Sequence, residues 1–312
     1  MLKLNTLFLA GFTVAAFGVA VLDARAQGSA GISISPTIFE LSADPGDTIQ
    51  NTLKLSNPTQ NTVTIQFVVE DFTTSGEEGR VVIEPAETFT HSLATWVTTD
   101  PAFVTLQPRE AKKIEFTIVV PENAEPGGHY GSILATITAS EGNEGFSGTA
   151  ISQKVGSLVL ITVSGAVREV LDIEEFVGPS FLEYGPVAFT IRFENKGSVH
   201  VRPRGFVTIT DWRDKKVIDL ELPQKNILPG SARKIDVVWD AKWLFGKYKA
   251  MIVGSYGSSN EPFPPHIISF WVFPWKIAGA AGFAALLVLT FFFFTRKRWI
   301  RAFKILLRGE KY

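Results

Sequence analysis

Histidine is the side chain most often used as an acid, a base or a metal ligand near neutral pH. The chain has four, His91, His129, His200 and His266, scattered without the spacing of a known metal motif. There is no H-E-x-x-H, no G-x-S-x-G and no phosphate-binding loop. The glycine-rich residues 127–131 lie between strand patterns without a following helix, which indicates a tight turn. The sequence therefore predicts a protein that is not an enzyme and has no metal or cofactor.

Acidic residues surround one glycine-rich turn, where Asp71, Glu77 and Glu78 lie close to Gly76 and Gly79. Several carboxylates on one loop suit a weak calcium site. Their spacing matches no EF-hand, however, and a loop of solvated carboxylates has the same pattern. We expect the solvated loop.

Four tryptophans of the central region are candidates for binding, because indole rings stack on sugars and on partner side chains. Trp96 and Trp239 stand in alternating strand patterns, which favours the hydrophobic core. Trp212 follows a strand end, and Trp243 precedes a glycine turn, so both are expected to be exposed. Trp212 and Trp243 are the predicted binding residues for a glycan or a protein partner.

The two ends of the chain carry targeting signals. Lys3, the apolar residues 7–21 and the small residues 24–26 form a signal peptide, with cleavage expected after Ala26. A retained N-terminal anchor is the alternative, although the apolar stretch is short for a bilayer.

Residues 277–295 carry no charge and extend about 28 Å as a helix, close to the hydrocarbon thickness of a bilayer. Tryptophans flank this span, and basic residues follow it, so the C-terminus is expected in the cytoplasm. A buried core helix is the alternative, but it would show a polar face. The residues expected to anchor the chain are Trp271, Trp275, Arg296, Lys297, Arg298, Trp299 and Arg301.

Charge is unevenly distributed along the chain. Residues 27–167 carry 6 Lys and Arg against 16 Asp and Glu, a net charge of −10, whereas residues 296–312 carry 7 against 1, a net charge of +6. An acidic exported region argues against nucleic acid as a partner, because binding phosphate requires cationic surface. The chain has no cysteine, so each domain depends on its own hydrophobic core.

Between the two ends, apolar residues alternate with polar ones at a period of two in many short segments separated by Gly, Pro and Asn turns. This pattern predicts an all-β protein with two Ig-like β-sandwich domains in tandem. The expected divisions are a signal peptide (1–26), a first sandwich (27–167), a second sandwich (168–262), a juxtamembrane link (263–275), a transmembrane helix (276–295) and a basic cytoplasmic tail (296–312).

The two predicted sandwiches share local patterns. Asn57 and Asn195 each end an apolar strand, and residues 106–116 resemble residues 228–237. In both units a glycine and a tyrosine then open another strand. The units follow one plan, either by duplication or by convergence.

Several motifs resemble the WxL-interacting protein family of bacterial surfaces. They are I-S-I-S-P-T-I-F-E-L at 32–41, D-P-G-D-T at 44–48, L-K-L-S-N-P-T at 53–59, E-D-F-T-T-S-G at 70–76, N-K-G-S-V-H-V-R-P-R-G at 195–205 and I-L-P-G-S at 227–231. The resemblance implies an N-terminal peptidoglycan-binding domain, a second partner-binding sandwich and a C-terminal membrane anchor.

The leading hypothesis is a non-catalytic protein of the bacterial cell membrane, crossing it once with its sandwiches outside. It would bind cell-wall polymer or another surface protein. The alternative is a membrane-tethered chaperone or assembly factor, similar to the pilus-type periplasmic chaperones, that offers a strand edge to its client. A long unpaired edge would favour this alternative, whereas edges blocked by proline or bulges would count against it.

Overall fold

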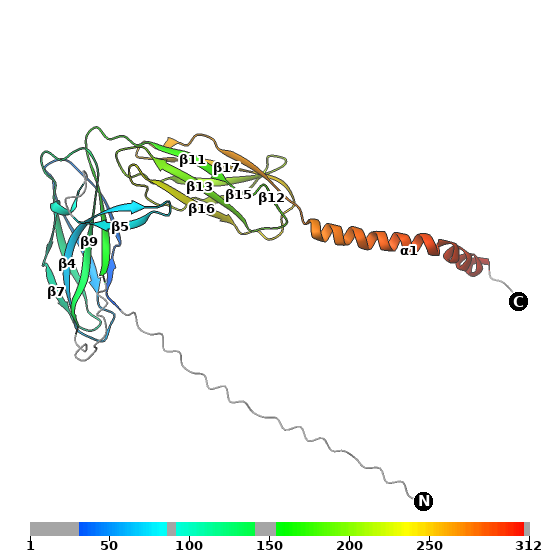
Figure 1. Ribbon diagram of the computed structural model, residues 1–312, viewed down its shortest axis with the longest axis horizontal. Coiled ribbons are helices and arrows are strands. Elements are labelled where there is room, and N and C mark those ends of the chain that lie inside the picture. The colour runs from blue at the N-terminus through cyan, green and yellow to red at the C-terminus, as the bar shows by residue number, and fades with distance from the viewer. Residues whose placement is uncertain (1–30, 86–91, 141–153, 309–312) are drawn as a thin grey trace, which may run out of the picture.

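The computed structural model describes residues 31–85, 92–140 and 154–308. Two β-sandwiches are joined in an L, and a helix continues from the end of the second one (Figure 1). The predicted signal peptide, its alternative as a retained anchor, and His91 lie outside the described residues.

The first sandwich has two sheets. One has the order β1 (Ser33–Ser35), β3 (Thr48–Ser56), β8 (Ala111–Val119) and β6 (Val97–Asp100). The other has the order β2 (Ile38–Ala43), β10 (Lys154–Val163), β9 (Gly127–Ser140), β4 (Val63–Ser75) and β5 (Arg80–Glu84), with β7 (Phe103–Leu106) also paired to β4. A single 3₁₀ turn, η1 (Ala94–Trp96), precedes β6.

The alternating residues meet between these sheets as the sequence predicts. Leu53 and Leu55 of β3 and Ile114, Phe116 and Ile118 of β8 are all within 1% of complete burial. Successive side chains of a strand point to opposite faces, so each of these strands buries one face and exposes the other.

The second sandwich repeats the plan. One sheet has the order β11 (Leu171–Val177), β13 (Val187–Asn195) and β16 (Ala232–Trp239). The other has the order β12 (Phe181–Leu182), β19 (Ile267–Val272), β17 (Gly246–Tyr256), β14 (Arg204–Asp211) and β15 (Lys216–Glu221), with β18 (Glu261–Pro262) beside β17. In both sandwiches the strand at one edge pairs in parallel, β2 with β10 and β12 with β19.

The boundary of the second sandwich differs from the prediction. Residues 263–275 are not a link, because β19 lies inside the sheet between β12 and β17. Phe263, Phe270 and Val272 belong to the hydrophobic core. The prolines at 262, 264 and 265 suggested a linker and concealed the alternation of Ile268, Phe270 and Val272 that follows them.

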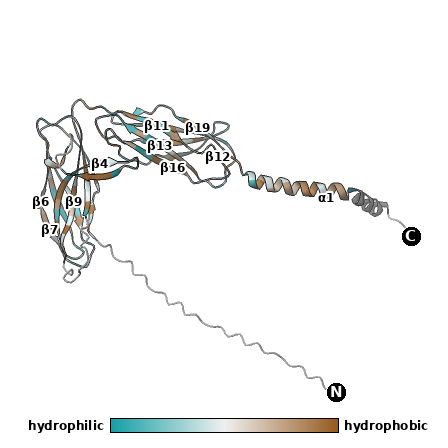
Figure 2. Cartoon of the chain, viewed as in Figure 1, coloured by the Kyte–Doolittle hydropathy of each residue, from teal (hydrophilic) through white to brown (hydrophobic). Residues whose placement is uncertain are grey.

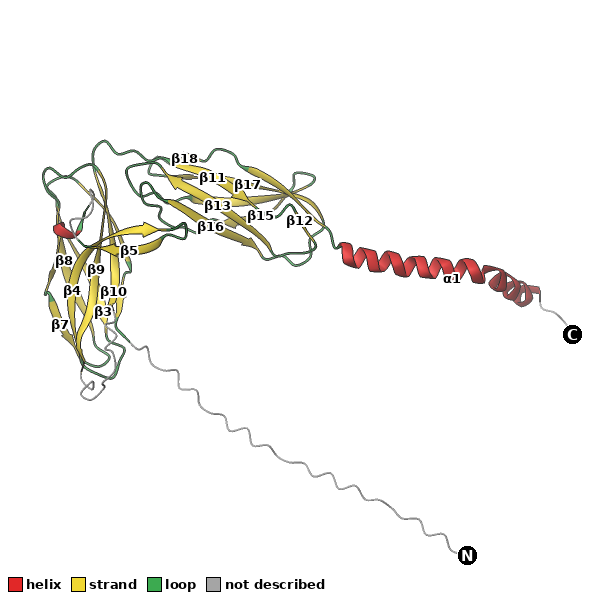
Figure 3. Cartoon of the chain, in the orientation of Figure 1, coloured by secondary structure: helices red, strands yellow, loops and turns green. Residues whose placement is uncertain are grey.

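The helix α1 (Trp275–Arg308) begins directly after the short segment Phe273–Pro274, and it continues without a break into the predicted basic tail as far as Arg308 (Figure 3). Its stretch Trp275–Arg296 is long and apolar enough to cross a membrane, and none of it is buried against the rest of the chain (Figure 2).

Candidate functional site

The strand β2 forms an open edge of the first sandwich. Its six residues pair with β10. The carbonyl oxygens of Thr37 and Ala43 point towards β10 and accept hydrogen bonds on that side. Because backbone groups alternate in direction along a strand, those of Ile38, Glu40 and Ser42 point to the opposite side. Among the described residues, no strand pairs with that side.

Two edge strands of the second sandwich, by contrast, are protected. The backbone N–H of Lys234, on the edge strand β16, donates a hydrogen bond to the carbonyl of Glu77, which lies at the tip of the β4–β5 hairpin (2.6 Å). The edge strand β11 is irregular between Ile173 and Glu175. Covering loops and irregular strands are the usual means by which proteins block edge pairing. Within the part of the chain that the structure describes, the β2 edge has neither a covering loop nor a break in its register.

An apolar contact holds the two sandwiches together in the inner corner of the L, which we call the elbow. Phe72, Tyr130 and Leu160 lie on the outer face of the first sandwich and pack against Leu228, from the segment between β15 and β16. All four are at least 92% buried, and the rings of Phe72 and Tyr130 meet edge-on at 5.9 Å. Burial of these side chains favours one relative position of the two domains.

A cavity of about 230 Å³ lies in the elbow beside this contact. Its apolar wall includes Ile38 at the start of β2, which is 45% exposed, and Leu158 of β10. Its polar wall includes Arg202, Lys225 and Arg233 from the second sandwich. The Nε of Arg233 is buried without a hydrogen-bond partner, and burial lowers the pKa of its guanidinium. The open β2 edge therefore adjoins an apolar recess with a cationic rim.

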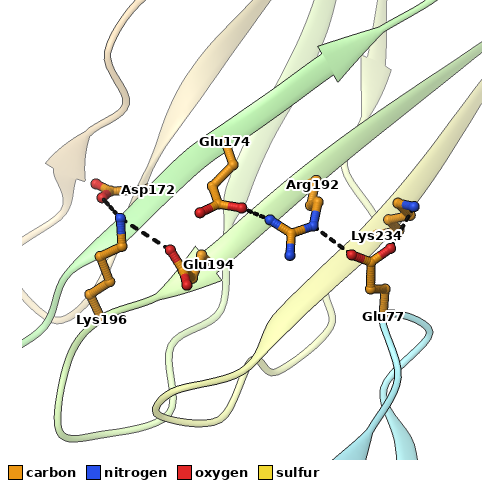
Figure 4. Close-up of polar contacts among 7 residues, drawn as sticks. All are labelled: Glu77, Asp172, Glu174, Arg192, Glu194, Lys196 and Lys234. Atoms are coloured by element: carbon orange, nitrogen blue, oxygen red, sulfur yellow. Dashed lines mark hydrogen bonds and ion pairs between the residues drawn. The ribbon is translucent and has the colours of Figure 1, made fainter.

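The tip of the β4–β5 hairpin contacts the second sandwich on one side of the elbow, through ion pairs of Glu77 that we call the Glu77 clamp (Figure 4). The carboxylate of Glu77 accepts from Nε of Arg192 at 2.6 Å and from Nζ of Lys234 at 2.5 Å, and Arg192 also pairs with Glu174. The hydrogen bonds from Lys234 and then Arg192 lower the pKa of Glu77. The sequence pattern placed this glutamate in a solvated loop, and the structure corrects that assignment, because its partners lie in the other domain.

A second polar contact joins the domains at β2 itself. Glu40 pairs with Arg202, and it also accepts a hydrogen bond from Nδ2 of Asn226 at 2.5 Å. A polar cavity of about 240 Å³ lies beside this pair and reaches Glu169 and His200. The side chain of Glu40 is thus engaged with the second domain, while its backbone remains on the open edge.

His200 lies against Tyr130 at the same boundary, with the Tyr130 hydroxyl 3.5 Å from Nδ1 and the rings edge-on. Burial lowers the pKa of His200, against a smaller opposing effect of the Glu40 carboxylate. Burial also raises the pKa of the Tyr130 hydroxyl. The contact favours a neutral imidazole.

The acidic residues proposed as a calcium alternative are not brought together. Asp71 is fully buried in β4, where its Oδ1 accepts from the backbone N–H groups of Leu93 and Ala94. Glu77 points into the second domain, and Glu78 is exposed. Across the described residues, no group of three or more His, Cys, Asp or Glu side chains is arranged to hold a metal ion.

The tryptophans are placed as predicted. Trp239 is buried in the second core, and Trp96 packs half-buried on the first core and on the ring of His129. Trp212 and Trp243 are 63% and 76% exposed. They lie far from the elbow, at the end of the second sandwich next to α1, and their role in binding remains a prediction.

Of the predicted anchoring residues, Trp271 lies near the end of β19 and Trp275 is the first residue of α1. Both are 54% exposed. Arg296 stacks on the ring of Phe293 at 4.6 Å. The side chains of Lys297, Arg298, Trp299 and Arg301 lie outside the described part of the structure, although their backbone is helical.

No family model and no curated protein matches this sequence. Among solved structures, it is similar to the class 5 fimbriae chaperone CfaA, with 11% identity, a TM-score of 0.39, and coverage of 77% of this chain and 99% of that one. It is also similar to the Pseudomonas aeruginosa CupB2 chaperone (10% identity, TM-score 0.35, 75% and 97% covered) and to the E. coli chaperone DraB (11%, 0.34, 77% and 96%). At these identities the similarity concerns the fold alone.

Proposed function

We propose that this protein is a membrane-tethered, non-catalytic binding protein for extended segments of other surface or exported polypeptides. The open β2 edge beside the apolar elbow cavity carries the proposal. An extended segment would add one strand to β2 through backbone hydrogen bonds, which give affinity without requiring a particular sequence. This corresponds to the assembly-factor alternative. The helix α1 would hold the protein at the membrane with both sandwiches outside.

The wall of the cavity suits such a segment. Every second side chain of an added strand would point towards Ile38 and Leu158, so apolar residues at alternate positions would be favoured. Arg202 and Lys225 at the rim would favour acidic residues or a carboxylate beside them. The peptidoglycan ligand implied by the family resemblance stays a prediction, because the described residues offer no observation that favours it.

Photo-crosslinking in intact cells tests the proposal. A photoreactive phenylalanine analogue replaces Ile38, and the matched control places it at Val119, an exposed β-branched residue on the other sheet of the same sandwich. We expect crosslinks to exported polypeptides at Ile38 and few at Val119. Equal crosslinking at both sites would exclude a site at β2.

A backbone variant distinguishes strand pairing from non-specific binding to the apolar surface. The N–H of Ser42 points away from β10, so Ser42→Pro removes a donor from the open edge while keeping the pairing with β10. Crosslinking from Ile38 should fall several-fold in Ser42→Pro and stay unchanged in Ser42→Ala. An unchanged yield in the proline variant, with an unchanged thermal unfolding curve, would rule out edge pairing.

A further inference from the structure

Exposed aromatic side chains gather at one end of the second sandwich, the end from which α1 departs. Strand register defines this end, since β19 finishes at Val272 opposite Gly246, where β17 begins. Trp243 is 76% exposed, Phe245 68% and Trp212 63%. We call these three residues, together with Trp271, Phe273 and Trp275, the aromatic collar.

The opposite end of the same sandwich is different. The aromatic rings near its β17–β18 turn, Tyr256 and Phe263, are only 7% and 8% exposed, and they stack on each other within the core. Phe206 of β14, opposite Val253, is also 45% exposed, so exposed rings are concentrated at the α1 end without being confined to it. A soluble domain seldom gathers apolar rings on its surface without a partner for them.

The collar lies at the level where α1 begins. The ring of Phe245 contacts the ring of Phe273 at 5.6 Å between centroids, and Phe273 precedes the helix by two residues. The Cδ1 of Trp212 is 3.9 Å from the position that a Cβ on Gly246 would occupy. Trp243 lies three residues before Gly246, in the loop between β16 and β17. These residues therefore share the end of the sandwich at which α1 begins.

The short segment Phe273–Pro274 is fixed to the sandwich and cannot act as a loose tether. The backbone N–H of Phe273 donates to the carbonyl of Leu182 at 2.9 Å. Nζ of Lys276, in the first turn of α1, pairs with the carboxylate of Glu183 at 2.8 Å. The helix axis and the end of the sandwich are therefore held together, and whatever surface surrounds the start of α1 also meets the collar.

Cationic side chains accompany the exposed rings, together with the exposed Asp240 and with Asp214, which pairs with Nζ of Lys249. Arg213 stacks on Trp212 with its guanidinium carbon 4.3 Å from the ring centroid. Lys215 and Lys242, in the same two loops, are exposed. Tryptophan and cationic side chains together are typical of surfaces that lie in the headgroup layer of a bilayer, where the rings reach the acyl boundary and the charges meet anionic lipid.

We propose that the aromatic collar is a second membrane-contact surface, which enters the headgroup layer of the bilayer that α1 crosses. The proposal rests on the membrane tether of the proposed function, and it is independent of the client segment at β2. Trp212 and Trp243 then bind lipid and not a glycan. The second sandwich stands on the membrane by its end, with α1 as its central fixing point.

The absence of cysteine makes a direct test possible, since one introduced cysteine gives one labelling site. The full chain is reconstituted in bilayer nanodiscs of phosphatidylcholine and phosphatidylglycerol, with a polarity-sensitive fluorophore at Trp243→Cys. Ser259→Cys, exposed at the opposite end of the sandwich, is the control, and Leu287→Cys reports on the centre of α1. Lys242→Cys repeats the measurement with every ring of the collar retained.

Lipids that carry a quencher near the headgroup should quench the labels at positions 243 and 242 several-fold more than the label at 259, and iodide in the water should show the reverse order. If the label at 287 is protected by lipid while those at 242 and 243 behave like the one at 259, the collar proposal is wrong and the tether stands. If the label at 287 is itself accessible to iodide, the tether fails and the collar with it.

Discussion

Asn57 and Asn195 make closely corresponding hydrogen bonds, one in each sandwich. Nδ2 of Asn195 donates to the carbonyls of Val199 and Ile227, both at 2.8 Å, and Nδ2 of Asn57 donates to the carbonyls of Asn61 and Gln107 at 2.8 and 3.0 Å. In each case Oδ1 accepts a backbone N–H two residues later. Both side chains are fully buried. Each asparagine thus closes a strand end onto two loops.

We predict that Asn195→Ala destabilises the second sandwich. The substitution removes the donor to the carbonyl of Val199, whereas the carbonyl of Ile227 keeps a second donor, the backbone N–H of Val201. An unsatisfied buried group costs about 1–3 kcal/mol. Chemical denaturation monitored by tryptophan fluorescence measures the change in the free energy of unfolding. Asn51→Ala, at a half-buried asparagine whose side chain accepts only from its neighbour Thr52, is the control and should lie near the wild type.

Loss of the Glu77 clamp should loosen the elbow without unfolding either sandwich. Glu77→Gln removes the charge that holds Arg192 and Lys234, but solvent screens ion pairs of this exposure, so the sandwiches should lose little stability. Spin labels on single cysteines in the two domains should therefore show a broader distance distribution with little change in unfolding temperature. Glu78→Gln, next to it in the chain and exposed, should match the wild type. A narrow distribution in Glu77→Gln would mean that the apolar contact alone fixes the L.

Acid should weaken the same clamp. The pKa of Glu77 is lowered in the folded chain from its ordinary value of 4.5, so its contribution is complete above about pH 4.5 and is lost as the pH falls through the lower, folded pKa. The distance distribution of the wild type should broaden in that range, and that of Glu77→Gln should not respond through this group.

We predict that His200 makes the stability of the fold depend on pH in a second range. Its folded pKa lies below 6.5 because burial disfavours the imidazolium, so the unfolded chain takes up a proton first as the pH falls below 6.5. Stability should therefore decrease as the pH falls from about 6.5 towards the folded pKa. His200→Phe keeps a ring against Tyr130 and should flatten this part of the curve of unfolding free energy against pH. An equally steep curve in the variant would assign the effect to another group.

The role of α1 as a tether is open to direct test. Leu287→Arg places a charge near the centre of the apolar stretch Trp275–Arg296, which costs about 2.5–3.5 kcal/mol on insertion scales. A Leu287→Arg/Leu289→Arg double variant should move from the membrane fraction to the soluble or aggregated fraction. Leu287→Ile/Leu289→Ile should stay with the membrane and resist carbonate extraction.

Local patterns predicted the sandwiches well, because alternation with a period of two has one physical meaning when one face is buried. The boundary at Val272 was missed because prolines separate β19 from the preceding strand. The elbow was missed for a different reason: Glu77 meets Arg192 and Lys234 more than a hundred residues away, and no local pattern encodes that contact. One signal was available, since the unbroken apolar run of residues 158–161 in β10 indicates a strand buried on both faces.

The rigid start of α1 also sets the direction in which the elbow faces. Figure 1 shows α1 continuing along the second sandwich, while the first sandwich extends to one side of it. With α1 across a bilayer, the first sandwich lies like an arm over the membrane, and the inner corner of the L opens towards the lipid surface. The pair of Lys276 and Glu183, between α1 and the second sandwich, favours this orientation. A polypeptide newly released at that surface would therefore reach the β2 edge before one that diffuses in from beyond the arm.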